Sequence, residues 1–512
     1  MKTSKYPIHQ QWLAILILLC AQAASAAGAN PDQTDPQALP IPDAKPAAVH
    51  FELKQVIFSD SAFLGKDELA GIAAAYTGRQ VGLDDINQLV SDVNALYARK
   101  KIMTGLAVLS GGQIIDGQIH IHLDEARYGQ AQVKSGYTSA DYILAQLHFK
   151  SGDIVDLAQM DQRMSGFNRS HEIQLGAEIN PGSAAGFTDL VINTQEPDQY
   201  QLKLFADNQN APSLGRDEAG VDAAVAGLLG RGDLLTLMLS KSSGATNINA
   251  GYGVGVGADG TTLNTALSKN NIAIQSGSYS KIAITGITDK ATLGVNQPLL
   301  SDQEWLLATD FNYFKSIAKN YSAGVLLSKF DINGCSADFS ANRRTELYQW
   351  SSLLQVDYGR AVDQSDTRSD YVLYSGNGNG MLPLFGDVYG TIRANGQFSK
   401  ASRVPSSALF QIGGPATVRG YDTGFATGVD GYALSTELHD TLGAGFDVFG
   451  FVDHGQVGSA MTAKTKITGL GLGVGWTWKT LVAKLTYGHA EQLVHPDQSK
   501  GRVDFRIEGR IF

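Results

Sequence analysis

Cysteine is scarce in this sequence. Its 512 residues include two cysteines, Cys20 and Cys335, and Cys20 lies in an N-terminal segment that we expect to be removed. A mature chain that keeps Cys335 alone cannot form an intrachain disulfide, even in a compartment that would permit one. Its stability must therefore come from burial and hydrogen bonding.

Long apolar runs and basic charge are also lacking. After the N-terminus, no apolar run approaches the roughly twenty residues that a membrane-spanning helix needs. The chain has 50 Asp and Glu against 40 Lys and Arg, a formal net charge of -10, and loss of the two N-terminal lysines would make it -12. Proteins that bind nucleic acid usually present a basic face, so no nucleic-acid partner is expected.

The N-terminus has the parts of a secretory signal peptide. Two lysines precede an apolar run from Leu13 to Leu19, and Ala24 and Ala26 supply the small residues that signal peptidase requires. The run is less than half as long as a membrane anchor. We expect a signal peptide over residues 1–26 and a proline-rich, extended linker over residues 27–49.

Two α/β units follow the linker. In residues 50–127 the pattern predicts one strand, two helices and two strands, and the helix over 83–99 has apolar residues at spacings of three and four. Residues 128–198 repeat the same order of elements. Because one order recurs at once, the sequence predicts a tandem pair of small domains.

The rest of the chain alternates apolar and polar residues. From Gln201 to Phe512 we predict sixteen antiparallel strands of about ten residues, such as 303–313 and 321–331. We assign 271–285 to a loop, because counting it as a strand would make the number odd. An even number of short strands is typical of a bacterial outer-membrane barrel, in which short turns on one side alternate with long loops such as 401–430 on the other.

Two motifs in this region are the most informative. Val418-Arg419-Gly420-Tyr421 lies in the long loop, and Phe451, Asp453 and Gly455 form an F-x-D-x-G pattern about thirty residues later. Together, behind two α/β units, they resemble the VRGY loop and the F-x-D-x-G strand of the two-partner secretion transporters of the TpsB type, the ShlB/FhaC/HecB family. Residues 297–301 similarly resemble the periplasmic Pro-Leu-Leu turn of that family.

The resemblance implies a fold and a location. It implies α+β POTRA domains over 50–127 and 128–198 in the periplasm, and an all-β barrel over 199–512 in the outer membrane of a Gram-negative bacterium. The POTRA domains would capture an unfolded TpsA-type exoprotein, and the barrel would conduct it to the cell surface. Outer-membrane lipids and the outer-membrane barrel assembly machinery are the other partners implied. No cofactor, no metal and no enzymatic activity are expected.

The alternative function is that of a barrel assembly factor related to BamA and TamA, which share the loop motif. Those relatives usually carry three or more POTRA domains, whereas this chain has room for two. An outer-membrane lipase or protease is a further alternative. It would need a nucleophile or an acid pair at a loop rim, and we find none in the sequence.

The physics of the two motifs favours a contact between Arg419 and Asp453. The period of two in a strand places Phe451, Asp453 and Gly455 on one barrel face, and a carboxylate is costly on the face toward lipid. A guanidinium and a carboxylate in the lumen can form a bidentate contact that pins the loop. The other interpretation leaves Arg419 exposed and Asp453 solvated, without a contact between them.

Several weaker patterns have ordinary explanations. His454 follows Asp453, but adjacent residues of a strand point to opposite faces, so a catalytic dyad is not expected. His120 and His122 share one strand face, but the sequence offers no third ligand nearby, so a solvated surface is expected rather than a metal site.

Two features depart from the family pattern. About twenty proline-rich residues are available where many members carry a plug helix, so a plug helix is not expected here. Phe512 would be the membrane-insertion signal, but Val503, Phe505, Ile507 and Ile511 alternate out of phase with it. Either a bulge near Gly509 restores the phase, or Phe512 points inward.

Overall fold

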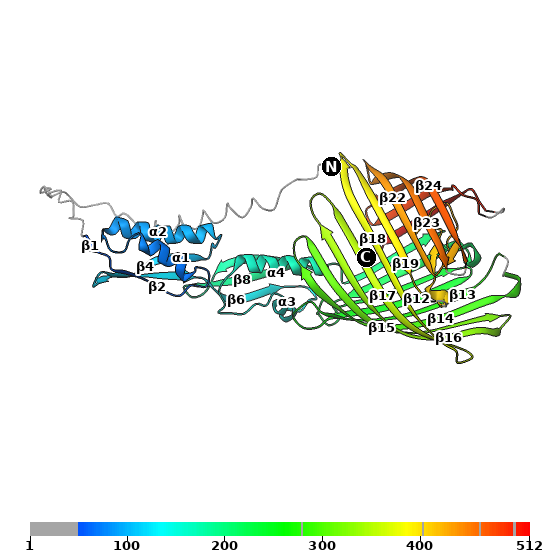
Figure 1. The fold of residues 1–512 in the computed structure, drawn as a ribbon, viewed down its shortest axis with the longest axis horizontal. Coiled ribbons are helices and arrows are strands. Elements are labelled where there is room, and N and C mark those ends of the chain that lie inside the picture. Colours follow the sequence, from blue (N-terminus) through cyan, green and yellow to red (C-terminus); the bar gives the residue numbers. More distant parts are fainter. Residues whose placement is uncertain (1–49, 278–279, 402–403, 460–461, 495–497) are drawn as a thin grey trace, which may run out of the picture.

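The computed structural model describes residues 50–277, 280–401, 404–459, 462–494 and 498–512. The predicted signal peptide and linker lie outside these residues. Along the long axis of the molecule, two α/β units lie in a row and are followed by a barrel (Figure 1).

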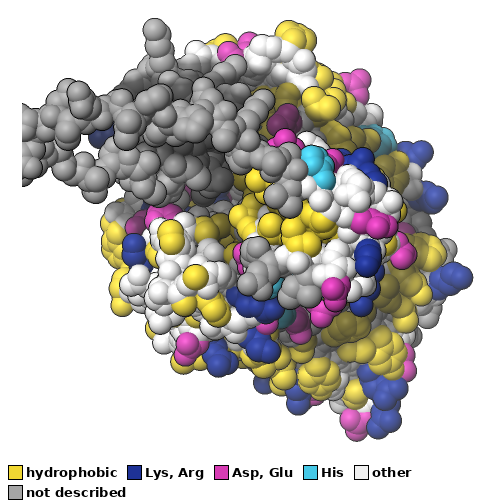
Figure 2. Space-filling view, turned by 90° about the vertical axis from the view of Figure 1, so that its left-hand side faces the viewer, with side chains coloured by type: hydrophobic (Ala, Val, Ile, Leu, Met, Phe, Trp, Pro, Cys, Tyr) yellow, Lys and Arg dark blue, Asp and Glu magenta, His cyan; other side chains and the backbone are white. Residues whose placement is uncertain are grey.

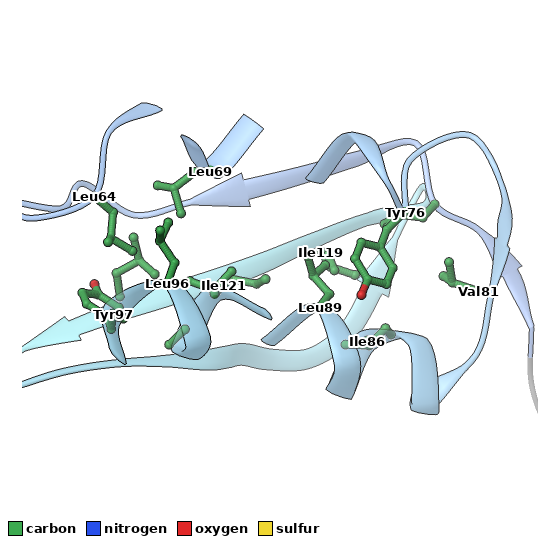
Figure 3. Packing of buried hydrophobic residues seen from close by; sticks show 14 residues of the cluster. Leu64, Leu69, Tyr76, Val81, Ile86, Leu89, Leu96, Tyr97, Ile119 and Ile121 are labelled. Carbon is green, nitrogen blue, oxygen red and sulfur yellow. The ribbon is translucent and has the colours of Figure 1, made fainter. Parts of the chain in front are cut away.

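The first unit is a three-stranded sheet covered by two helices. Its strands have the order β2-β5-β4, with β2 parallel to β5 and β4 antiparallel to it. The apolar stripe of α2 packs on the inward side chains of β5, among them Ile119 and Ile121 (Figure 3). The elements of the unit are β1 (Phe51–Glu52), β2 (Gln55–Phe58), α1 (Lys66–Ala74), β3 (Gln80–Val81), α2 (Leu83–Arg99), β4 (Gly105–Ile115) and β5 (Gln118–Glu125).

The first strand differs from its prediction. It is divided into β1 and β2, and β1 pairs with β3, a two-residue strand between the helices that the sequence did not reveal. Short pairings of this kind have too few residues for a detectable period.

The second unit repeats the first. Its sheet has the order β6-β8-β7, again with one parallel and one antiparallel pair. In each unit an asparagine of the longer helix bonds both backbone groups of one edge-strand residue, Asn94 to Ala107 and Asn168 to Leu175. The elements are β6 (Arg127–Lys134), α3 (Ala140–Gln146), α4 (Leu157–Ser170), β7 (Gln174–Pro181) and β8 (Phe187–Gln195).

The barrel is closed. Among the described residues, sixteen antiparallel strands form it, which confirms the predicted number. The loop expected over 271–285 is shorter than predicted, because β13 extends to Ala273 and β14 begins at Ile284. The strands are β9 (Tyr200–Asp207), β10 (Glu218–Ala226), β11 (Leu234–Ser242), β12 (Ala245–Gly255), β13 (Thr262–Ala273), β14 (Ile284–Ser301), β15 (Trp305–Ser322), β16 (Val325–Arg344), β17 (Gln349–Asp363), β18 (Arg368–Phe385), β19 (Val388–Phe398), β22 (Asp430–Gly443), β23 (Phe446–Ser459), β24 (Thr462–Trp478), β25 (Leu481–Ala490) and β26 (Gly501–Arg510).

Side chains alternate between the two faces of the barrel wall. Leu235, Leu237 and Leu239 of β11 are exposed on the outer face, whereas Ser240 and Ser242 of the same strand are buried inside. Figure 2, which views the molecule from the end of the α/β units, shows hydrophobic side chains gathered on the visible outer wall, with Lys and Arg at its margin. Cys335 of β16 is also exposed and carries a free thiol.

The central strands are longer than predicted. β14 to β18 have 15 to 20 residues each, so parts of the predicted connections after 303–313 and 321–331 belong to strands. Beyond the band of exposed apolar side chains on the outer wall, the outward residues become polar. The hydrogen-bonded pairing of β15 with β16 continues there, as in Lys319↔Lys329. The alternation of hydrophobicity therefore ends before the strand does.

The second unit is bonded to the nearest barrel turns. Ser301 Oγ donates to Gly166 O of α4 at 2.6 Å, Gln303 Nε2 donates to Asp161 Oδ2 at 3.1 Å, and Ser139 N donates to Gly230 O at 2.8 Å. The predicted Pro-Leu-Leu turn is in fact the bulged end of β14, and the turn follows it at Asp302.

The barrel closes between β26 and β9. This seam has five register pairs, from Arg506↔Asp207 to Arg510↔Lys203, against eighteen between β15 and β16. At its end, Ile511 N donates to Leu202 O while Leu202 N donates to Phe512 O, so two residues oppose one. The irregularity lies after Gly509, not at it, and Ile511 and Phe512 are both exposed.

Candidate site inside the barrel

The connection between β19 and β22 folds back into the barrel. It contains a 3-10 turn (Ser406–Ala408) and a small hairpin of β20 (Phe410–Ile412) and β21 (Ala426–Gly428). Its segment 418–421 contacts the inner wall, where Val418, Arg419 and Tyr421 are each no more than 3% exposed. Ile412, Val418 and Tyr421 pack in one cluster with Val457 and Ile467 of the wall, so the loop has an apolar core of its own.

Arg419 and Asp453 meet in a bidentate contact. Arg419 Nε donates to Asp453 Oδ2 at 2.7 Å, and Arg419 Nη2 donates to Asp453 Oδ1 at 2.7 Å. The backbone N of Arg419 adds a bond of 3.0 Å to Oδ2. Because Asp453 is fully buried, these charge-assisted bonds fix the loop in one position more surely than they add net stability.

Arg419 also reaches β22, which sequence analysis missed. Arg419 Nη1 lies 2.6 Å from Glu437 Oε1, and Nη2 donates to Ser435 Oγ at 2.9 Å. Glu437 Oε2 is 2.9 Å from His439 Nε2, and His439 Nδ1 is 2.8 Å from Asp447 Oδ2. The signal was available, since Ser435, Glu437 and His439 are polar residues spaced by two within an apolar strand.

The remaining residues of the F-x-D-x-G motif support the same contact. Phe451 and Asp453 lie on the inner face of β23, and the guanidinium carbon of Arg419 is 3.5 Å from the centre of the Phe451 ring. A Cβ at Gly455 would come within 2.9 Å of Val418 Cγ2. The aromatic ring therefore supports the cation, while the missing side chain leaves room for the loop.

The next two residues carry the loop across the wall. Gly420 has φ +91, and a Cβ there would lie 2.8 Å from the carbonyl carbon of His489, so both its conformation and its surroundings require glycine. Tyr421 donates its hydroxyl to Thr468 O at 3.0 Å or Gln492 O at 3.0 Å. Successive residues of the motif thus contact three strands: Arg419 contacts β23, Gly420 contacts β25 and Tyr421 contacts β24.

The loop then reaches the seam. Asp422 Oδ1 bonds Arg216 of the β9–β10 connection and lies 3.2 Å from Arg502 Nη1 of β26. Thr423 Oγ1 donates to Gln209 O at 2.7 Å. Sequence analysis had not singled out Asp422 or its partners, because they lie far apart in the chain and share no short motif.

The other candidates lie apart from this site. His454 faces away from Asp453 and bonds Thr468 Oγ1 at 2.9 Å. His120 and His122 are exposed on β5, where His122 Nε2 lies 3.0 Å from Asp124 Oδ1. In the part of the chain that the structure describes, no three His, Cys, Asp or Glu side chains are placed to hold a metal ion.

Two family models match this chain. The family model for haemolysin secretion/activation proteins, ShlB/FhaC/HecB, matches residues 186–476, and the model for the ShlB-type POTRA domain matches residues 51–125. This chain belongs to the ShlB/FhaC/HecB family. It is accordingly an outer-membrane transporter that moves a partner exoprotein out of the periplasm, into which its POTRA region projects.

The relatives in sequence are transporters. The outer membrane transporter CdiB of Dickeya dadantii is 22% identical over 406 residues, covering 76% of this chain and 72% of its own. The heme/hemopexin transporter protein HuxB of Haemophilus influenzae is 24% identical over 425 residues, covering 77% and 73%.

Solved structures share the fold of this ShlB-type chain. CdiB from Escherichia coli matches with a TM-score of 0.67 at 19% identity, covering 92% of both chains. CdiB from Acinetobacter baumannii gives 0.65 at 18%, covering 98% and 97%. BamA from Haemophilus ducreyi, lacking POTRA domains 1–3, gives 0.57 at 12%, covering 90% of this chain and 100% of its own.

Proposed function

We propose that the loop anchored by Arg419 and Asp453 governs the passage of a single TpsA-type exoprotein through this barrel. The observation that carries the proposal is the buried bidentate contact, which holds the VRGY segment against the lumen wall. A polypeptide needs the space that the loop occupies, so the loop must shift while the chain passes. In this proposal the pair sets the resting position to which the loop returns.

The α/β units supply the substrate in this proposal. Within the described residues, the edge strands β4 and β7 each pair with one strand only, and β4 (Gly105–Ile115) continues beyond Ala107, the residue that Asn94 bonds. An unfolded exoprotein can add a strand to such an edge. Keeping the chain unfolded until it emerges would let its folding outside oppose backsliding, with no nucleotide required.

The proposal includes the domain limits and the remaining partners. A signal peptide over 1–26 and a linker over 27–49 precede POTRA domains over 50–127 and 128–198 and a barrel over 199–512, with 401–430 entering from the extracellular side. The exposed apolar belt contacts outer-membrane lipids. Phe512 provides the signal that the barrel assembly machinery recognises. We assign no covalent chemistry to the chain.

Co-expression with a candidate TpsA-type exoprotein from the same genome tests the proposal. We expect the wild type to release the exoprotein into the medium. Arg419→Ala should reduce the amount released at least about tenfold, because it breaks a buried ion pair. Asp370→Asn, which removes an exposed ion pair with Arg360, is the control and should export normally. Normal export by Arg419→Ala at wild-type membrane levels would refute the role of the loop. If this chain instead restores insertion of other barrels to an assembly-deficient strain, it is an assembly factor.

A further inference from the structure

A cavity of about 560 Å³ opens inside the barrel at the end nearest the second α/β unit. The register of the ladders places several of its wall residues on one inward face, through pairs such as Arg344↔Gln349 and Arg393↔Ser435. The neutral polar side chains of this wall include Asn342, Gln349, Ser351, Asn379 and Thr391.

Three arginines line this cavity without an acidic partner. Arg169 comes from the last turn of α4, Arg344 from the end of β16 and Arg393 from β19. Within the described residues, none of the three makes an ion pair, and the Nε atoms of Arg169 and Arg393 are buried without an acceptor.

The acidic groups nearby are already engaged. Glu437 also lines the cavity, but its carboxylate bonds Arg419 and His439. Arg343 also contributes to the lining and pairs with Glu304 at 3.0 Å. The charge of Arg169, Arg344 and Arg393 is therefore left for something that enters the lumen.

The chemistry of the three groups defines that ligand. The buried Nε–H groups of Arg169 and Arg393 have no acceptor, which is unfavourable, and like charges around one cavity repel each other. A carboxylate removes both costs, because it accepts two parallel hydrogen bonds from one guanidinium. The neutral amides and hydroxyls around the arginines can bond a polypeptide backbone as well.

We propose that Arg169, Arg344 and Arg393 bind acidic side chains of the exoprotein as its unfolded chain passes from the POTRA region into the barrel. The inference rests on the transport function proposed above. It assigns this entrance a preference for segments rich in Asp and Glu. Since Arg169 belongs to α4, the site also joins the periplasmic part and the barrel in one contact with the substrate.

Channel recordings in planar bilayers test the site with defined probes. Heptaglutamate added on the periplasmic side should block the wild-type current, and heptalysine should not. The variant Arg344→Gln/Arg393→Gln should weaken the heptaglutamate block at least about tenfold. Adding Arg169→Gln should weaken it further. A matched control, Lys269→Gln/Arg360→Gln, removes the same charge from exposed pairs with Asp289 and Asp370 and should leave the block unchanged.

Other results would overturn the proposal. An unchanged block in Arg344→Gln/Arg393→Gln would do so, as would an equal loss in the control variant. If inorganic phosphate at the same charge concentration blocks as well as heptaglutamate, the site takes small anions rather than polypeptide. Because the recordings need no exoprotein, they succeed or fail independently of the export assay.

Discussion

The α-carbon of Gly420 lies against the backbone of His489, so that a methyl group on it would stand 2.8 Å from the carbonyl carbon and 3.0 Å from the next amide nitrogen. Since neither backbone can move without disturbing β25, Gly420→Ala should displace the loop. Trypsin should then cleave after Arg419, which is 3% exposed in the native fold. Mass spectrometry of the digest measures this directly.

Gly443 provides the control for that substitution. It also has positive φ, +79, but nothing lies within 4 Å of its Cβ position. Gly443→Ala should therefore cost about 1 kcal/mol of backbone strain and leave Arg419 protected. Equal cleavage in the two alanine variants would show that backbone conformation, not the close approach to His489, fixes the loop.

Arg419→Lys should lose the bidentate contact with Asp453. A lysine keeps the charge but cannot donate two parallel bonds, nor can it lie flat over Phe451. We expect a loss of about 3 kcal/mol or more in the free energy of loop docking. The rate of tryptic cleavage at position 419 measures this free energy. The reference is the double variant Arg419→Lys/Asp453→Asn. If the single variant is as protected as the wild type, charge alone holds the loop.

Asp422→Asn should have a smaller effect by itself. Its carboxylate is partly exposed between Arg216 and Arg502, and pairs of this kind contribute about 1 kcal/mol or less. The double variant Asp422→Asn/Asp453→Asn should change the cleavage free energy by more than the sum of the two single variants. The reason is that each of the two contacts keeps the loop in the position in which the other can form. Strict additivity of the cleavage free energies would argue against coupled anchors.

The packing of α4 should depend on pH through His171. Its ring stacks on Phe167 at 4.0 Å, its Nδ1 lies 3.1 Å from Phe167 O, and its Nε2 lies 2.9 Å from the Tyr142 hydroxyl. Because a carbonyl oxygen only accepts, the neutral ring carries its proton on Nδ1 and accepts from Tyr142 at Nε2. Burial lowers the pKa of His171 from 6.5. The native state then binds fewer protons than the unfolded state, so stability is full above pH 6.5 and decreases as the pH falls toward the lowered value.

Hydrogen exchange in α4 at pH 7.5 and 5.5, corrected for intrinsic rates, measures this dependence. His171→Phe should remove it, and His122→Gln, at an exposed position, should not. An unchanged pH dependence in His171→Phe would assign it to another group.

Much of this fold follows from periodicity, and much of the site does not. The spacing of Ile86, Leu89 and Val93 was sufficient to place α2, and alternation together with the even strand number of such barrels was sufficient to count the barrel strands. The lengths of β15 and β16 could not be predicted. Their backbone hydrogen bonding continues beyond the part of the wall that faces lipid, where outward side chains need not be apolar.

The partners of the site depend on register across the barrel. Arg419 and Asp453 were recognisable as motif residues, but Glu437 becomes a neighbour only through the pairing Glu437↔Phe451. Asp422 and Arg502 are 80 residues apart, and a sequence alone does not fix which loop meets which strand at closure. Such contacts are properties of the closed barrel rather than of any segment.

Cys335 gives the molecule a natural attachment point. It faces outward from β16, between Tyr313 and Tyr358 of the neighbouring strands, and is the only free thiol in the described residues. A fluorophore placed there would report its depth in the bilayer through quenchers attached to lipid chains. Replacing it by serine would leave a background in which pairs of new thiols, one on the loop and one on β23, could trap the loop in place during export.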